Sequence, residues 1–204
     1  MGQERKILQE SLSISQRLDD FQSIGSSYGR LGWFHLDKGE YAKAREFFEK
    51  AYEVYEKHEA KLNKMWSSTW LIRANIELGE FEKAKKLIDN THKFAHEVKD
   101  KLLIAIVDAL RAMLFRAQKK WKQSIEHFEK SLQEHEALNA RRWDVYGFAK
   151  LVLYEYARVY LERDKKGDRE KALNLFNQAL KIFQKLGAKK DIEKITAKKK
   201  LLTT

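Results

Sequence analysis

The chain of 204 residues contains no cysteine and no proline, and only nine of its residues are glycine. The absence of cysteine excludes disulfide bonds, thiolate metal sites and cysteine nucleophiles, and it suits a reducing, cytoplasmic compartment. The absence of proline lets helices run without interruption, because proline removes a backbone donor and clashes with the preceding turn.

Long apolar stretches are also absent. No run approaches the roughly 18 apolar residues of a membrane span, and the first residues lack the apolar core of a signal peptide. We therefore expect neither a membrane-spanning helix nor export. Hydrophobic residues still make up 43% of the chain, which is enough for a packed core.

The net charge of +11 is unevenly distributed. Residues 1–60 carry 9 Lys/Arg and 11 Asp/Glu, residues 61–120 carry 13 and 7, and residues 121–204 carry 19 and 12. One interpretation of the basic region after residue 61 is a surface for nucleic acid or another anionic partner. The other, which we favour, is a solvated lysine-rich helical surface.

An internal repeat of about forty residues is the clearest pattern in the sequence. Tyr41 is followed at this spacing by Phe81 and Trp121. The same spacing relates Ala44, Ala84 and Ser124; Phe48, Ile88 and Phe128; and Ala51, Thr91 and Ser131. After a short slip the pattern returns as Ala172, Phe176 and Ala179. Such a period predicts stacked helix pairs, each covering the apolar face of its neighbour.

Apolar residues spaced three and four apart predict about ten helices. These helices span residues 3–18, 20–37, 41–59, 62–78, 81–97, 101–118, 121–138, 141–163, 168–186 and 189–202. Gly39 can take the left-handed conformation that closes a helix, whereas the turn 118–120 has no glycine and predicts a non-glycine residue there. The first helix has the register of a second helix of a pair, either as a cap or because the chain is part of a longer protein.

Small residues predict where helices approach closely. Ala44 and Ala51 lie seven apart on one helix face, and Phe48 between them fills the groove that they leave. The predicted core comprises Leu31, Ala44, Phe48, Leu71, Ala84, Ile88, Phe115, Phe128, Ala157, Tyr160, Ala172, Phe176 and Leu180.

The chain resembles the tetratricopeptide repeat family over nearly its whole length. The resemblance is carried by Tyr28, Leu31, Gly32, Gly39, Tyr41, Ala44, Phe48 and Ala51 and by their counterparts in three further copies. The family's late proline is absent, and the unit is about 40 residues instead of roughly 34. The resemblance implies an all-α, right-handed superhelical solenoid of antiparallel helix pairs.

We predict a single repeat domain over residues 1–204. It comprises a capping helix or half-repeat at 1–19, helix pairs at 20–60, 61–100, 101–139 and 140–187, and a C-terminal capping helix at 188–204.

Catalytic motifs are absent: the sequence has no Walker glycine loop, no His-Glu-x-x-His and no Gly-x-Ser-x-Gly. We therefore predict a non-enzymatic protein without cofactor or metal. His92 and His96 lie four apart and one turn after Asp89, a spacing that could gather around one ion. We favour the interpretation that they are histidines of an exposed helix face.

A cluster of Arg141, Arg142, Trp143 and Lys150 offers phosphate contacts and base stacking, which is one mode of nucleic-acid binding. We favour the alternative that Trp143 begins a long amphipathic helix and covers the preceding hairpin.

The resemblance implies a protein-interaction scaffold that binds a peptide or helical segment in a concave groove lined by first helices. The half-repeat at the start raises the further hypothesis that this scaffold is one part of a larger regulatory or signalling protein. The predicted partner-binding residues are Trp33, Trp66, Arg73, Met113, Arg116, Tyr154 and Arg158. Aromatic and arginine side chains concentrate binding energy, so we expect a partly apolar partner bearing acidic groups. Alternatively, the two tryptophans pack between hairpins. The family's carboxylate clamp is excluded, because Gly29 and Trp33 occupy its lysine and asparagine positions.

Overall fold

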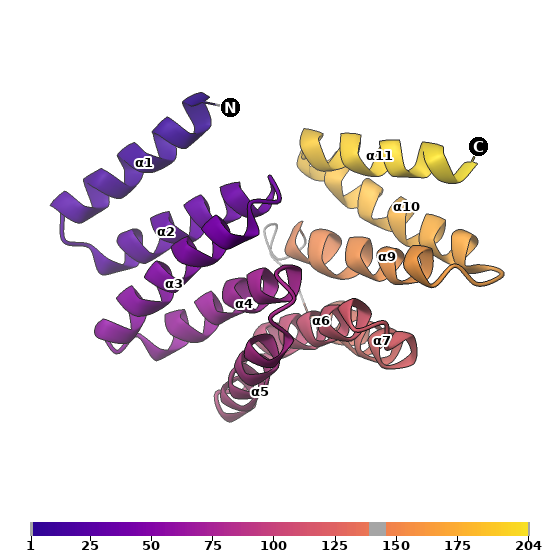
Figure 1. Cartoon of the computed structure of the whole chain (residues 1–204), viewed down its shortest axis with the longest axis horizontal. Coiled ribbons are helices and arrows are strands. Elements are labelled where there is room, and N and C mark those ends of the chain that lie inside the picture. Colours follow the sequence, from indigo (N-terminus) through magenta and orange to yellow (C-terminus); the bar gives the residue numbers. More distant parts are fainter. Residues whose placement is uncertain (1, 139–145, 204) are drawn as a thin grey trace. The chain divides into compact units, whose positions relative to one another are not determined.

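In the computed structural model, which describes residues 2–138 and 146–203, every regular element is helical (Figure 1). The chain divides into two compact units, Met1–Glu97 and Val98–Thr204. The predicted all-α fold is confirmed. Within the described ranges, none of the helices is both long and apolar enough to cross a membrane.

The first unit contains five helices, each packed against the next along the chain. They are α1 (Gly2–Arg17), α2 (Phe21–Leu36), α3 (Tyr41–Lys57), α4 (Lys61–Glu77) and α5 (Phe81–Glu97). In the terms of the repeat, α2 and α4 are first helices, and α3 and α5 are second helices.

The second unit continues with α6 (Lys101–Ala117), α7 (Trp121–Glu136), α9 (Tyr154–Arg163), α10 (Asp168–Leu186) and α11 (Lys189–Thr203). A π-helical turn, η1 (Phe148–Leu153), runs directly into α9. Sequence analysis predicted one regular helix over 141–163 and missed this wider turn. The start of that predicted helix lies outside the described residues.

The helices end at a recurrent turn position. At intervals of twenty residues, one residue after a helix takes a left-handed conformation, with φ between 52° and 76°. These residues are Asp19, Gly39, Glu59, Gly79, Lys99 and Lys119. At the first glycine, the Glu40 amide donates to the carbonyl of His35 at 3.0 Å, which satisfies a carbonyl at the helix end. The prediction of a strained non-glycine residue in the turn 118–120 is confirmed at Lys119.

Small side chains set the distance between the two helices of a pair. Ala44, Phe48 and Ala51 on α3 are fully buried. A Cβ atom added to Gly32 on α2 would overlap the Phe48 ring, so the ring occupies the space that the glycine leaves free. The predicted close approach of α2 and α3 is therefore present.

Where the sequence replaces alanine by a hydroxyl residue, the structure adds a hydrogen bond. Ser124 and Ser131 on α7 donate to the backbone carbonyls of Ala112 and Ala105 on α6, at 2.8 and 2.7 Å. On α5, Thr91 lies 2.6 Å from the hydroxyl of Ser68 on α4. These buried hydroxyls therefore pack as small residues while their polar atoms are satisfied.

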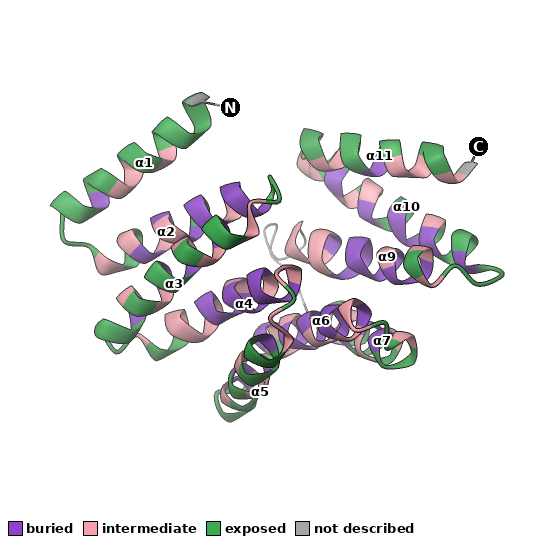
Figure 2. Ribbon diagram, viewed as in Figure 1, coloured by how far each residue is buried: buried purple, intermediate pink, exposed green. Residues whose placement is uncertain are grey.

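The buried side chains follow the facing sides of the helices (Figure 2). All the predicted core residues are buried except Phe115 and Leu180, which are only half-buried. The Phe115 ring stacks on His127 at 5.4 Å between centroids, at the partly exposed edge of the α6–α7 pair.

We expect Ala44→Trp to destabilise the protein by about 3 kcal/mol or more, because an indole cannot fit in this close-packed contact. The control is Ala42→Trp, two residues away on the exposed side of α3, which should change stability by less than about 0.5 kcal/mol. Urea unfolding followed by circular dichroism measures both. Equal effects would show that position 44 is not tightly packed.

We expect Lys119→Gly to raise the free energy of unfolding by about 0.5 kcal/mol. Glycine takes the left-handed conformation without strain, but it also gives the unfolded chain more conformational entropy, which offsets part of the gain. Lys120→Gly is the control: φ there is −85°, so only the entropic loss remains and stability should fall. The same unfolding assay applies. Destabilisation by both changes would contradict a strained turn at Lys119.

Candidate partner-binding surface

Equivalent positions on the first helices can be read by register. The spacing is forty residues from α2 to α4 and from α4 to α6, and forty-five from α6 to α9. One set of equivalent positions holds Trp33, Arg73, Met113 and Arg158, and the set one turn later holds Asp37, Glu77, Ala117 and Glu162. An arginine followed four residues later by a glutamate thus recurs on α4 and α9.

In the first unit, Trp33 is half-buried and packs on a cluster of buried residues from α2, α3 and α4. Its ring meets the Phe48 ring edge-on, with centroids 5.9 Å apart. The cluster also includes Leu71 and Ala74 of α4, in the next hairpin, so the packing of Trp33 matches the alternative interpretation, although the residue is only half-buried. Trp66, near the start of α4, is also half-buried.

Arg73 and Glu77 form an ion pair on α4. Arg73 Nε lies 3.4 Å from Glu77 Oε1, and both side chains are largely covered. Burial strengthens such a pair relative to one on an open surface, because water screens it less.

Trp70 is an aromatic residue that sequence reasoning missed. Its ring fills the space beside Gly29 on α2, where any Cβ atom would overlap it. The ring also tilts against Phe48, with centroids 5.8 Å apart. A lysine at position 29 would therefore have no room, which gives a steric reason for the absence of a carboxylate clamp.

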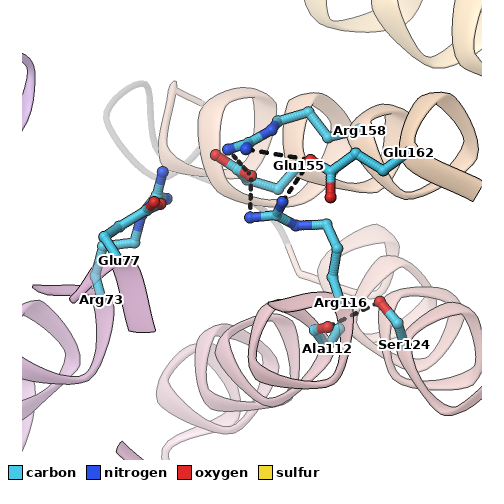
Figure 3. A network of polar contacts seen from close by, with 8 residues as sticks. All are labelled: Arg73, Glu77, Ala112, Arg116, Ser124, Glu155, Arg158 and Glu162. Atoms are coloured by element: carbon cyan, nitrogen blue, oxygen red, sulfur yellow. Dashed lines mark hydrogen bonds and ion pairs between the residues drawn. The ribbon is translucent and has the colours of Figure 1, made fainter. Parts of the chain in front are cut away.

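The second unit contains a four-residue ion network between α6 and α9 (Figure 3). Arg116 Nη1 donates to Glu162 Oε1 at 2.6 Å, and Arg116 Nη2 lies 3.5 Å from Glu155 Oε2. Arg158 donates to the same two carboxylates, at 3.0 Å to Glu155 and 3.2 Å to Glu162. Two cations and two anions thus neutralise one another.

Burial differs sharply within this network. Glu155 is 1% exposed and Arg116 is 5% exposed, whereas the side chain of Glu162 is 38% exposed. The inner carboxylate is shielded from water and relies on partners within the protein, the two arginines among them, whereas the outer carboxylate also reaches water.

Three of the predicted partner-binding residues are buried. Met113 is fully buried in α6, and Arg116 is enclosed by the network. Tyr154 is buried with its ring against Phe176, centroids 5.6 Å apart, and Lys194 Nζ lies 4.8 Å from the ring centre. The predicted residues thus divide into accessible ones on α2, α4 and α9 and buried ones beneath the surface of the second unit.

Asp108 on α6 is a buried carboxylate that sequence analysis did not single out. Its oxygens lie 3.1 Å from His127 Nδ1 and 2.7 Å from Lys130 Nζ, both on α7. Burial alone would raise the pKa of Asp108, but these hydrogen bonds outweigh it and hold the pKa below its ordinary value of 3.8. The ionised carboxylate therefore joins α6 to α7.

The metal interpretation of Asp89, His92 and His96 gains no support. The ring nitrogens Nε2 of the two histidines lie 3.2 Å apart, and the described ranges hold no group of three side chains arranged to bind a metal ion. Arg141, Arg142 and Trp143 lie outside the described residues.

A family model described as "Tetratricopeptide repeat" matches residues 25–58, which cover most of α2 and all of α3. This segment is similar to a tetratricopeptide repeat. The other helix pairs follow the same order of first and second helices, so the predicted resemblance is confirmed. Proteins built from tetratricopeptide repeats are typically non-catalytic, and the repeat supports a protein-interaction scaffold as the general class of function.

Solved structures share this tetratricopeptide-like fold. The apo form of RapI is 13% identical with a TM-score of 0.64, and the alignment covers 98% of this chain and 78% of RapI. BtubC (BKLC) from P. vanneervenii is 14% identical with a TM-score of 0.60, over 99% of this chain and 90% of BtubC. Both are helical repeat proteins, and at these identities the likeness concerns the fold alone. Comparison with curated protein sequences finds no match.

We expect Glu155→Gln to destabilise the protein by about 3 kcal/mol, because it removes the buried one of the two carboxylates that pair with the buried Arg116. Glu162→Gln should cost about 1 kcal/mol or less, since water reaches that position. Urea unfolding at neutral pH measures both. Equal costs would contradict the inference that burial makes the inner carboxylate essential.

Proposed function

We propose that this protein is a non-enzymatic scaffold that binds a peptide or helical segment of a partner protein on the surface of its first helices. In the first unit, the partly exposed residues Trp33, Trp66 and Arg73 touch the partner, and in the second unit Arg158 offers the contact that is equivalent in register to Arg73. Within the second unit, the buried Met113, Arg116 and Tyr154 hold the shape of the surface that carries Arg158. The observation that carries the proposal is the arginine–glutamate pair that recurs in register on α4 and α9.

These pairs favour a partner with both apolar and acidic groups. Each arginine side chain is mostly covered and its guanidinium is paired with a neighbouring carboxylate, so its orientation is set before the partner arrives. A carboxylate of the partner can form a charge-assisted bond to a guanidinium held in this way. Trp33 and Trp66 supply partly exposed aromatic surface for an apolar side chain.

Nucleic-acid binding through the basic region after residue 61 is the alternative. The first helices do not favour it, because Arg73, Arg116 and Arg158 alternate with carboxylates and so give a surface of mixed charge, whereas a phosphate backbone needs a continuous basic patch. On the α9–α10 connection, Arg163 is similarly held by Asp168 at 2.5 Å. Nucleic-acid binding would be recognised by an affinity for single-stranded DNA or RNA that falls steeply as the salt concentration rises, since phosphate binding releases counterions.

A random 12-residue peptide library displayed on phage, selected against the purified chain, provides the probe. We expect selected peptides to combine acidic residues with leucine or aromatic residues. For a synthetic copy of a selected peptide, Arg73→Ala should weaken binding by about 1–3 kcal/mol, because a charge-assisted bond is lost. Fluorescence polarisation measures the affinity.

Arg169→Ala is the control, because Arg169 is an exposed arginine on the second helix α10. Its affinity for the peptide should equal that of the unmodified chain. Full affinity in the Arg73→Ala/Arg158→Ala double variant would place the partner on another face. Binding of a fluorescent oligonucleotide in preference to every selected peptide would favour the alternative.

A further inference from the structure

One face of α1 is apolar and is not covered by the other helices of the first unit. The helix docks on α2 through Leu8, Ser11, Leu12 and Ser15. On the adjoining side, Ile7, Ile14 and Leu18 are 59%, 43% and 73% exposed. Figure 2 shows how little of α1 is buried compared with the helices that follow it.

The position of α1 in the repeat shows that this face is suited to pack against another helix. Ile7 is equivalent to Phe47 on α3, forty residues later. The Phe47 ring packs on Tyr28 and His35 of α2, the first helix of its own pair. The face of α1 that carries Ile7 is therefore the face with which a second helix covers another helix.

The exposed stripe also borders a cleft at the start of α2. The cleft has a volume of about 380 Å³ and is lined by residues of α1 together with Asp20 and Ser23. The stripe and the cleft form one continuous surface along the helix. Its residues lie at positions 7, 11, 14 and 18, so successive ones are four, three and four residues apart. This is the spacing with which two helices interdigitate.

We propose that α1 is a homodimer interface, in which the α1 helices of two copies pack antiparallel across this stripe. In this arrangement Leu18 faces Ile7 of the partner copy, and Ile14 faces the partner's Ser11. Each apolar side chain thereby gains a helix to pack against, as its equivalents on the later second helices do.

Charge complementarity sets the direction of the pair. Lys6, Glu10 and Arg17 are exposed along the flank of the stripe, and Asp19 and Asp20 follow at the end of the helix. Antiparallel packing brings Glu10 opposite Arg17 of the partner, and Lys6 opposite the partner's acidic end. Parallel packing would instead place the two charged flanks on opposite sides of the interface, so that Glu10 and Arg17 would not pair.

The surface is small, so the dimer should be weak. A helix of 16 residues is about 24 Å long, and one such contact falls at the low end of the size of specific interfaces. We therefore expect association that depends on concentration in the range of tens of micromolar, as is typical of a transient contact.

Sedimentation equilibrium of the full chain tests the proposal. The average mass should rise from 24.2 kDa at low concentration toward that of two chains at about 200 µM, as expected for weak association. Leu18→Glu should weaken association at least about tenfold, because it places a charge in the apolar stripe. Leu201→Glu is the matched control: Leu201 on α11 is 78% exposed, and its substitution should leave association unchanged.

Charge reversal tests the antiparallel direction. Glu10→Arg and Arg17→Glu should each weaken the dimer, because like charges then face each other, and the double variant should restore it. Circular dichroism checks that every variant keeps its helical content. A chain that stays monomeric up to about 200 µM, well above the expected association range, would overturn the proposal. A dimer that is insensitive to Leu18→Glu would overturn it as well.

Discussion

The close approach between the two helices of a pair is the constraint on which the rest of the structure depends. A buried ring such as Phe48 can sit between Ala44 and Ala51 only because Gly32 on the facing helix has no side chain. The short turns at intervals of twenty residues then keep successive helices antiparallel and in contact. Each pair is held together by this packing, without any disulfide, and so presents its first helix at a defined angle.

The two units meet this constraint with different chemistry. The first unit packs rings against small apolar residues, and Trp70 extends this packing to the next pair. The second unit adds polar connections between its helices: serine hydroxyls on backbone carbonyls, Asp108 to Lys130, and Arg116 to Glu162. Buried polar groups fix geometry only when all their partners are in place. The arginines held in this way are the groups that we propose for recognition of an acidic partner.

Sequence periodicity predicted the helices, their order and most of the core, because one side chain type recurs at each buried position. It failed where partners come from distant parts of the chain. Met113 and Tyr154 were assigned to an accessible groove, yet tertiary packing buries them. Register could not show that Glu155 and Glu162 neutralise Arg116, because these residues lie about forty positions apart. No local sequence pattern predicts the π-helical turn at Phe148–Leu153 either.

A double-mutant cycle between Gly32 and Phe48 tests the packing constraint most directly. Gly32→Ala favours the helix by about 1 kcal/mol in intrinsic propensity, yet in the unmodified chain it should destabilise, because the new methyl group meets the Phe48 ring. In a Phe48→Leu background the ring is gone, so Gly32→Ala should be neutral or stabilising. A coupling energy of about 2 kcal/mol is expected from urea unfolding of the four proteins. Equal costs of Gly32→Ala in both backgrounds would contradict the claim that this contact sets the spacing of the helices.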